Sequence, residues 1–194
     1  MTAYLLISLP HRSAVQIVGS FQNGVLAELL LDGQHSRLHF LLPLQFLLFP
    51  FLLRLLCGED VPHTGTVECG SRLQISHVQQ DPSGLRGDLS AYAAQHGLDE
   101  SLFKAILRKL DFARVQFEKD MQSYSAGQRK KVLLAASLCQ SAHVFIWDEP
   151  LNYIDLLSRI QLEELIKKNR PTMLIVEHDR AFIENIGAEV VGMG

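Results

Sequence analysis

Two short apolar runs in the C-terminal half of the chain each end in acidic residues, and this pattern restricts the fold more than any other feature. Val144–Trp147 is followed by Asp148-Glu149-Pro150, and Met173–Val176 is followed by Glu177-His178-Asp179. A continuous apolar run of this length is typical of a strand buried on both faces, as in parallel sheets. The helical stretch Leu156–Lys168 lies between them, and the order strand, helix, strand predicts a right-handed parallel crossover. We therefore expect an α/β fold with a parallel core sheet.

Local patterns predict the remaining elements of this part of the chain. Ser125 and Gln128 have the spacing of a capping box and predict a helix from about Ala126 to Cys139. Asp99-Glu100-Ser101 opens a second helix that ends near Asp111, because its apolar residues fall on one stripe. Runs rich in β-branched residues on either side of a tight turn predict two short strands, Thr64–Glu68 and Leu73–Val78.

The charge balance excludes a class of partners. The chain of 194 residues has 18 Lys and Arg against 21 Asp and Glu, a formal net charge of −3. No chain-wide basic field exists, so we expect no DNA partner, and any contact with rRNA or the ribosome would need a local patch. Arg129-Lys130-Lys131 is such a cluster, but we interpret it as a solvated helix face. The three cysteines have no metal-site spacing, which favours a reducing, cytoplasmic compartment.

The first quarter of the chain differs from the rest in composition. Before Arg54, the residues that carry formal charge are Arg12, Glu28, Asp32 and Arg37. No Lys or Arg precedes the apolar N-terminal stretch, so we reject a secretory signal peptide. The run Phe40–Leu53 is strongly apolar, yet it contains two prolines and is shorter than the roughly 20 residues that a membrane-spanning helix needs. We expect a buried or poorly ordered segment here and no membrane span.

The acid pair Asp148-Glu149 is the first candidate for chemistry. Adjacent carboxylates at the carboxyl edge of a sheet repel each other unless a cation or ligand lies beside them. Successive residues at a strand end point in different directions, so one acid could face Mg²⁺ while the other reaches an attacking water. The pair therefore indicates a metal and phosphate site, although an acidic turn that ends at Pro150 would show the same sequence pattern.

Two further elements point to a phosphate. Ser125-Ala126-Gly127-Gln128 places a hydroxyl and exposed N–H groups at a helix N-terminus, which attracts anions, although a plain N-cap explains this tetrapeptide better when it is considered alone. His178 ends the next apolar strand, and therefore lies on the same sheet edge as Asp148-Glu149. It could donate to a phosphate oxygen, whereas a lone histidine there is more often structural.

Taken together and in this order, these residues resemble the ATP-binding cassette (ABC) ATPases. Tyr124–Gln128 resembles the family signature, Val144–Glu149 the Walker B strand, and Leu151–Asp155 the D-loop. His178 matches the switch histidine, and Gln80 matches the Q-loop glutamine. The sequence of these motifs and their neighbours resembles in particular the C-terminal cassette of ABC-F proteins. Among these are the ribosomal protection proteins that confer lincosamide, pleuromutilin and streptogramin resistance. The likeness covers about residues 52–194.

The resemblance implies a P-loop NTPase-type ABC cassette with a parallel core sheet and a helical subdomain between about residues 86 and 123. It also implies ATP and Mg²⁺ as cofactors. In these terms Glu149 would be the general base that orients water, and His178 would contact the γ-phosphate. Asp148 and Gln80 would serve Mg²⁺, and Gln80 would thereby contribute to cofactor binding.

The resemblance implies a partner as well. Ser125, Ala126, Gly127 and Gln128 would bind ATP held by a second cassette in trans, and Asp155 would help to couple the two sites. In ABC-F proteins two cassettes share one chain with a linker that enters the ribosome. We therefore expect a cytoplasmic, ribosome-associated system, with ATP binding and hydrolysis linked to translation.

The chain departs from the family where the Walker A loop should be. Counting back from the helix that follows that loop, the lysine should fall near Phe49 and the hydroxyl near Pro50. The G-x-x-x-x-G spacing from Gly19 to Gly24 is followed by Val25-Leu26 in place of Lys and Ser or Thr, and we treat it as chance. We interpret residues 1–51 as an atypical apolar segment in place of the Walker A region, and residues 52–194 as a partial ABC ATPase domain.

Three origins of the segment 1–51 remain open: a frame-shifted translation joined to a cassette remainder, which we favour; an evolved replacement; and a membrane anchor. Three functions remain open too. The chain could hydrolyse ATP with a partner cassette, although loss of Walker A predicts defective hydrolysis. It could be a nonhydrolytic module that binds a ribosome or a cassette, or the nucleotide-binding subunit of an ABC transporter.

Overall fold

The computed structural model describes residues 4–8, 25–31, 34–40, 53–61 and 72–191. Most strands of this part form one five-stranded sheet in the order β4-β5-β6-β1-β7, and β2 pairs with β3 in a separate hairpin. The sheet strands are β1 (Tyr4–Ser8), β4 (Ile75–Val78), β5 (Val144–Asp148), β6 (Met173–Glu177) and β7 (Glu189–Val191). The hairpin consists of β2 (Val25–Leu31) and β3 (Gln34–Phe40).

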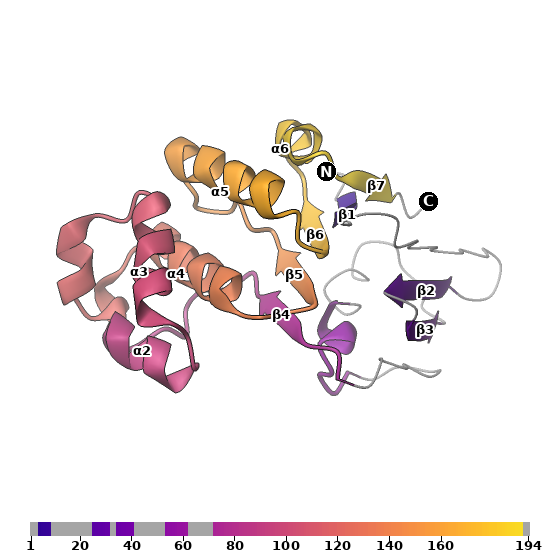
Figure 1. Ribbon diagram of the computed structural model, residues 1–194, viewed down its shortest axis with the longest axis horizontal. Coiled ribbons are helices and arrows are strands. Elements are labelled where there is room, and N and C mark those ends of the chain that lie inside the picture. The colour runs from indigo at the N-terminus through magenta and orange to yellow at the C-terminus, as the bar shows by residue number, and fades with distance from the viewer. Residues whose placement is uncertain (1–3, 9–24, 32–33, 41–52, 62–71, 192–194) are drawn as a thin grey trace.

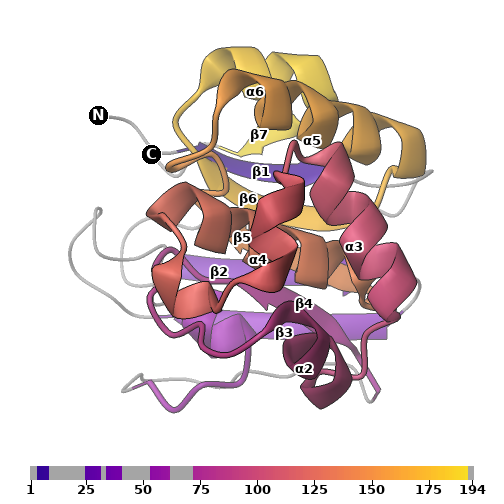
Figure 2. The same ribbon diagram turned by 90° about the vertical axis from the view of Figure 1, so that its left-hand side faces the viewer.

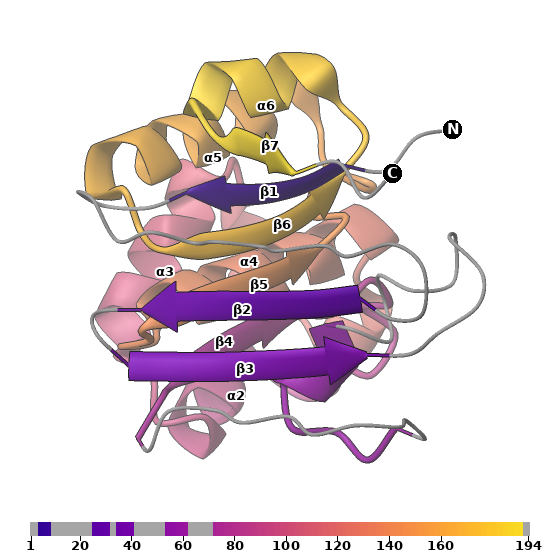
Figure 3. The same cartoon turned by 90° about the vertical axis from the view of Figure 1, so that its right-hand side faces the viewer.

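The core of the sheet is parallel, as the apolar runs predicted. β5 pairs parallel with both β4 and β6, so the carboxyl ends of these strands lie at one edge. β1 differs, because it runs antiparallel to β6 with Tyr4 opposite Glu177 and Ser8 opposite Met173 (Figure 3). The sequence patterns predicted no strand before residue 52, and the direction of β1 makes the sheet mixed rather than wholly parallel.

Helices cover one face of the sheet, and the β2–β3 hairpin lies on the other side (Figure 1). A helical subdomain that contains α2 and α3 packs beside α4, as predicted for residues 86–123 (Figure 2). Within the described residues, no helix is long and apolar enough to cross a membrane. The helical elements are α2 (Leu89–Gln95), α3 (Glu100–Lys109), η1 (Arg114–Glu118), η2 (Met121–Ser123), α4 (Ala126–Cys139), α5 (Leu156–Asn169) and α6 (Arg180–Ile186).

Side-chain caps fix where the helices begin. At α4 the Ser125 hydroxyl accepts from the Gln128 N–H at 3.2 Å, and the Gln128 side chain accepts from the Ser125 N–H at 3.0 Å. This reciprocal pair is the predicted capping box. Asp99 caps α3 by accepting from the Leu102 N–H, as its acidic opening indicated. The predicted strand Thr64–Glu68, the apolar run 41–52 and the Gly19–Gly24 spacing lie outside the described residues.

The core lies between the sheet and helices α3, α4 and α5, and β5 is at its centre. The first four residues of β5 are buried, and the Trp147 side chain has no exposed surface. Trp147 Nε1 donates to Ser137 Oγ of α4 at 2.9 Å, and this oxygen lies 2.6 Å from Ser76 Oγ of β4. One hydroxyl of α4 therefore satisfies buried polar groups from two strands.

We predict that Ser137→Ala lowers the free energy of unfolding by about 1–3 kcal/mol, because it leaves the buried Trp147 N–H without an acceptor. Urea unfolding followed by circular dichroism would measure this loss. Ser101→Ala, on the exposed side of α3, is the matched control and should change stability by about 0.5 kcal/mol or less. Equal stability of the two variants would contradict the prediction.

Candidate functional site

The carboxylate of Glu149 is the point at which three side chains meet. Gln80 Nε2 donates to Glu149 Oε2 at 2.6 Å, and Asn152 Nδ2 donates to the same oxygen at 2.5 Å. The other oxygen, Oε1, lies 3.2 Å from His178 Nε2. These residues come from the segments that follow β4, β5 and β6, and they meet because parallel strands end at one edge.

The backbone of Glu149 is held in an uncommon conformation. Its φ is 46°, in the left-handed region that L side chains rarely adopt. The Glu149 N–H donates to the Val176 carbonyl at 2.9 Å, so β6 holds the turn that follows β5. Such strain costs on the order of 1 kcal/mol and persists where surrounding contacts enforce it, most often at functional sites.

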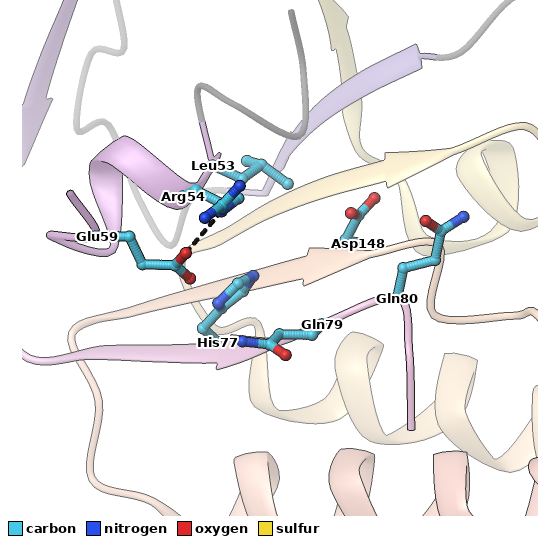
Figure 4. A pocket seen from close by; sticks show the side chains of 7 residues that line it. All are labelled: Leu53, Arg54, Glu59, His77, Gln79, Gln80 and Asp148. Atoms are coloured by element: carbon cyan, nitrogen blue, oxygen red, sulfur yellow. Dashed lines mark hydrogen bonds and ion pairs between the residues drawn. The ribbon is translucent and has the colours of Figure 1, made fainter. Parts of the chain in front are cut away.

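Asp148 lies beside Glu149 at the end of β5 and faces a cavity of about 320 Å³. Burial raises the pKa of the Asp148 carboxyl, the negative charge of Glu149 raises it further, and the Lys130 ammonium opposes both. In Figure 4 the Asp148 and Gln80 side chains lie at one end of this cavity. The remaining lining residues are Leu53, Arg54, Glu59, His77 and Gln79.

The donor set fits a hard cation such as Mg²⁺. Asp148 offers carboxylate oxygens, and Gln80 offers its amide oxygen, since its Nε2 is engaged with Glu149. Within the described ranges, no group of three His, Cys, Asp or Glu side chains is placed to hold a metal. Mg²⁺ usually takes one or two protein carboxylates and completes its shell with phosphate oxygens and water.

The basic cluster after the capping box is not a solvated face, and this corrects our interpretation. Lys130 and Lys131 have only 0% and 7% of their surface exposed. Lys130 Nζ donates to the main-chain carbonyls of Gln79 and Asp148 at 2.9 and 3.1 Å. The α4 face that carries these lysines packs against the sheet edge and the D-loop, so they serve the interior of the domain.

A second group of predicted residues gathers at the start of α4. Lys131 Nζ forms an ion pair with Asp155 Oδ2 at 2.6 Å. A Cβ added to Gly127 would lie 2.3 Å from the Tyr153 carbonyl oxygen, so only glycine allows this close approach. The signature segment and the segment before α5 are therefore neighbours within one chain. They are connected to Glu149 through Asn152 of the same loop.

Comparison with known proteins decides the family. The family described as ABC transporter matches residues 51–152, which is more than half of the chain. The chain belongs to this family. The matched range includes the ABC motifs from Gln80 to Asn152, and His178 lies beyond it.

The relatives of this chain are of the ABC-F type, as the motifs of the chain indicated. It is 32% identical over 146 residues to the "ATP-binding protein Uup-like" of Haemophilus influenzae, covering 71% of this chain and 32% of that protein. It is 31% identical over 139 residues to the "Ribosome protection protein VmlR" of Bacillus subtilis, covering 69% of this chain and 25% of that protein. The chain thus spans about a third or less of the length of these relatives.

A solved structure shares the ABC fold. It is the complex of the archaeal ribosomal stalk protein aP1 and the archaeal ribosome recycling factor aABCE1, with a TM-score of 0.58 and 20% identity. The match covers 93% of this chain and 38% of that one. At this identity the likeness shows the fold and no more.

Two residues of the site escaped sequence analysis. Asn152 was identified only as part of the D-loop and was given no role. Its side chain donates to Glu149, three positions earlier in a tight turn. Lys130 stood in a basic cluster, yet its ammonium is buried beneath the acidic edge. Helical spacing was the available signal for Lys130, because it shares one face of α4 with buried Leu134 and Ser137.

We predict that Gly127→Ala destabilises the chain by about 1–3 kcal/mol, because the added methyl would collide with the Tyr153 carbonyl. Helix propensity alone favours alanine by about 1 kcal/mol, so a loss would have to come from the contact. Gly84→Ala is the control, since a Cβ there meets nothing within 4 Å. If urea unfolding gives Gly127→Ala a stability at or above that of the unsubstituted chain, the close approach does not exist.

We predict that Asp155 stabilises the domain above about pH 4 and that this contribution fades as the pH falls toward 2. Burial raises the pKa of Asp155, but hydrogen bonds from Lys131 and Ser158 outweigh it and lower the pKa from 3.8 to about 2. A depressed pKa means that protonation on acidification removes the stabilisation. The carboxylate is 48% exposed, so solvent screening limits the effect to about 1 kcal/mol.

The measurement for Asp155 is urea unfolding at several pH values between 2 and 6. Asp155→Asn keeps the helix cap and should lose the increment at pH 6 but not at pH 2. Lys131→Met should remove the same increment, and the double variant should show little further loss. An unchanged difference across this pH range would exclude the ion pair as its source.

Proposed function

We propose that this chain is an ABC-F-type cassette that contributes to a shared ATP site with a second cassette and is defective in hydrolysis. The observation that carries the proposal is the position of the Glu149 carboxylate. It accepts hydrogen bonds from the side chains of Gln80 and Asn152 and faces His178. A general base must be fixed in orientation, and a carboxylate held from two sides meets that need.

Each side chain at this edge has a task in the proposal. Glu149 orients the attacking water, and His178 donates to the γ-phosphate. Asp148 and the amide oxygen of Gln80 would hold Mg²⁺, which would supply positive charge to offset the negative charge of the phosphates. The cavity beside Asp148 provides room for the metal and part of the phosphate chain.

The start of α4 would contact ATP that a second cassette holds. Ser125 Oγ accepts the capping hydrogen bond from the Gln128 N–H, which leaves its own hydrogen to donate outward. The N–H groups of Ala126 and Gly127 belong to the first turn of α4, where an anion is favoured. Asp155, tied to α4 through Lys131, would couple this end to the loop that carries Glu149.

The direction of β1 supports the hydrolysis defect. Ser8, its last residue, lies beside Met173, at the sheet edge opposite His178. β1 therefore ends at the opposite edge of the sheet from Glu149 and His178. Phe49 and Pro50 stand where the lysine and hydroxyl are expected, so the charge that cancels phosphate repulsion is missing. The division at residues 51 and 52 rests on this loss of the phosphate loop, since β1 of the first part lies within the sheet of the second.

We predict that the purified chain with Mg·ATP shows no turnover above that of its Glu149→Gln variant. Removing one preorganised donor typically costs about 10²–10³ in rate, and here the whole phosphate cradle is lost. Steady-state phosphate release measures this. Turnover by the unsubstituted chain that disappears in Glu149→Gln would contradict the proposed hydrolysis defect. Gly19–Gly24 would then be the candidate phosphate loop.

The names of relatives support a ribosomal partner over a membrane one. One relative is called a ribosome protection protein, and the protein of shared fold is called a ribosome recycling factor. We propose a cytoplasmic chain that associates with ribosomes and their rRNA, with antibiotic resistance as the associated trait. Sedimentation of tagged chain through sucrose separates the alternatives, because recovery with membranes instead of ribosomes would favour a transporter subunit.

A further inference from the structure

Lys130 is a buried charge that the proposed roles do not use. Its side chain has no exposed surface, although it lies only five residues after Ser125 at the start of α4. An ammonium taken out of water costs several kcal/mol unless partners compensate. Its partners are the main-chain carbonyls of Gln79 and Asp148. Burial lowers the pKa of Lys130 to about 8, and the carboxylates of Asp148, Glu149 and Glu177 oppose this shift.

The two carbonyls are informative because each belongs to the residue just before a residue of the candidate site. Gln79 immediately precedes Gln80, and Asp148 immediately precedes Glu149. Gln80 and Glu149 then meet each other through their side chains at 2.6 Å. One ammonium thus clamps two backbone segments whose next residues form the candidate metal and water site.

We propose that Lys130 is a positioning residue that holds the ends of β4 and β5 in the arrangement that Gln80, Asp148 and Glu149 need to bind the metal. This rests on the proposed function, since the metal site belongs to it. Because Lys130 projects from α4 directly behind Ser125–Gln128, the clamp also joins the signature end of α4 to the metal site. Movement of one would be transmitted to the other through this side chain.

Charge and position predict opposite results when Lys130 is removed, so the proposal has a decisive test. An ammonium beside a cation site repels the cation, and if Lys130 acted by charge alone its loss would tighten metal binding. If Lys130 acts by holding the ligands, its loss weakens metal binding despite the relieved repulsion. Loss of an outer partner of metal ligands typically costs about 10–100-fold in affinity.

The experiment uses the full chain, with Mn²⁺ in place of Mg²⁺ and with ATP present, and electron paramagnetic resonance measures unbound Mn²⁺. Because ATP itself binds Mn²⁺, every sample is compared with a protein-free sample at the same ATP concentration. Lys130→Met should bind Mn²⁺ about tenfold or more weakly than the unsubstituted chain. Lys104→Met, the same change on α3, should bind as the unsubstituted chain does. Unchanged or tighter binding by Lys130→Met would overturn the proposal.

Two additions keep the test decisive. Lys130→Arg keeps the charge but changes the length of the side chain, so weaker Mn²⁺ binding by this variant would come from the position of the charged group. Lys130→Arg also replaces Lys130→Met in the test if Lys130→Met does not fold. Hydrogen exchange of residues 79–81 and 148–152 should be about tenfold or more faster in Lys130→Met, since the variant loses two hydrogen bonds from a charged group. Unchanged exchange there overturns the clamp.

Hydrogen exchange also separates the two proposals. If the unsubstituted chain does not bind Mn²⁺ but the exchange rates change as expected, the metal site fails while the clamp stands. If the chain binds Mn²⁺ and neither quantity responds to Lys130, the metal site stands and the clamp fails.

Discussion

Three carboxylates, Asp148, Glu149 and Glu177, crowd the carboxyl edge of the parallel sheet, and the surrounding structure is arranged to hold them there. Glu177 is buried and accepts the main-chain N–H groups of Leu151, His178 and Asp179. Glu149 is held by side chains, whereas Asp148 lines the cavity with a raised pKa. Backbone donors thus neutralise one acid, amides orient another, and the third is left to a cation.

The loop from Glu149 to Asp155 joins this edge to the start of α4. Its Asn152 contacts Glu149, its Tyr153 carbonyl covers Gly127, and its Asp155 pairs with Lys131. Glu149 and Tyr153 both have positive φ, so the loop is held in a strained course by contacts at both ends. In the proposed function ATP contacts both ends of this loop, and the loop would couple them through contiguous contacts.

The region before residue 52 gives the cassette a different balance of charge from that of an intact phosphate site. In the proposed function the residues at the acidic edge orient water and hold a metal, but they would add negative charge beside a nucleotide that is already anionic. Two described cations lie at this edge: Arg54 lines the cavity and pairs with Glu59, and Lys130 is buried and directed at main-chain carbonyls. Lys130 therefore stabilises the protein side of the site and is not placed to cradle phosphates.

The sequence alone determined the elements whose signals are local. The two residues of the capping box, Ser125 and Gln128, are close in sequence, and the apolar runs that became β5 and β6 are each continuous. Their patterns could therefore be interpreted directly. Only the tertiary structure decided the direction of β1 and the burial of Lys130. These depend on partners distant in sequence, β6 for the strand and Gln79, 51 residues away, for the lysine. Helical spacing indicates that Lys130 shares a face with buried residues, but no local pattern records which distant backbone groups will need a donor.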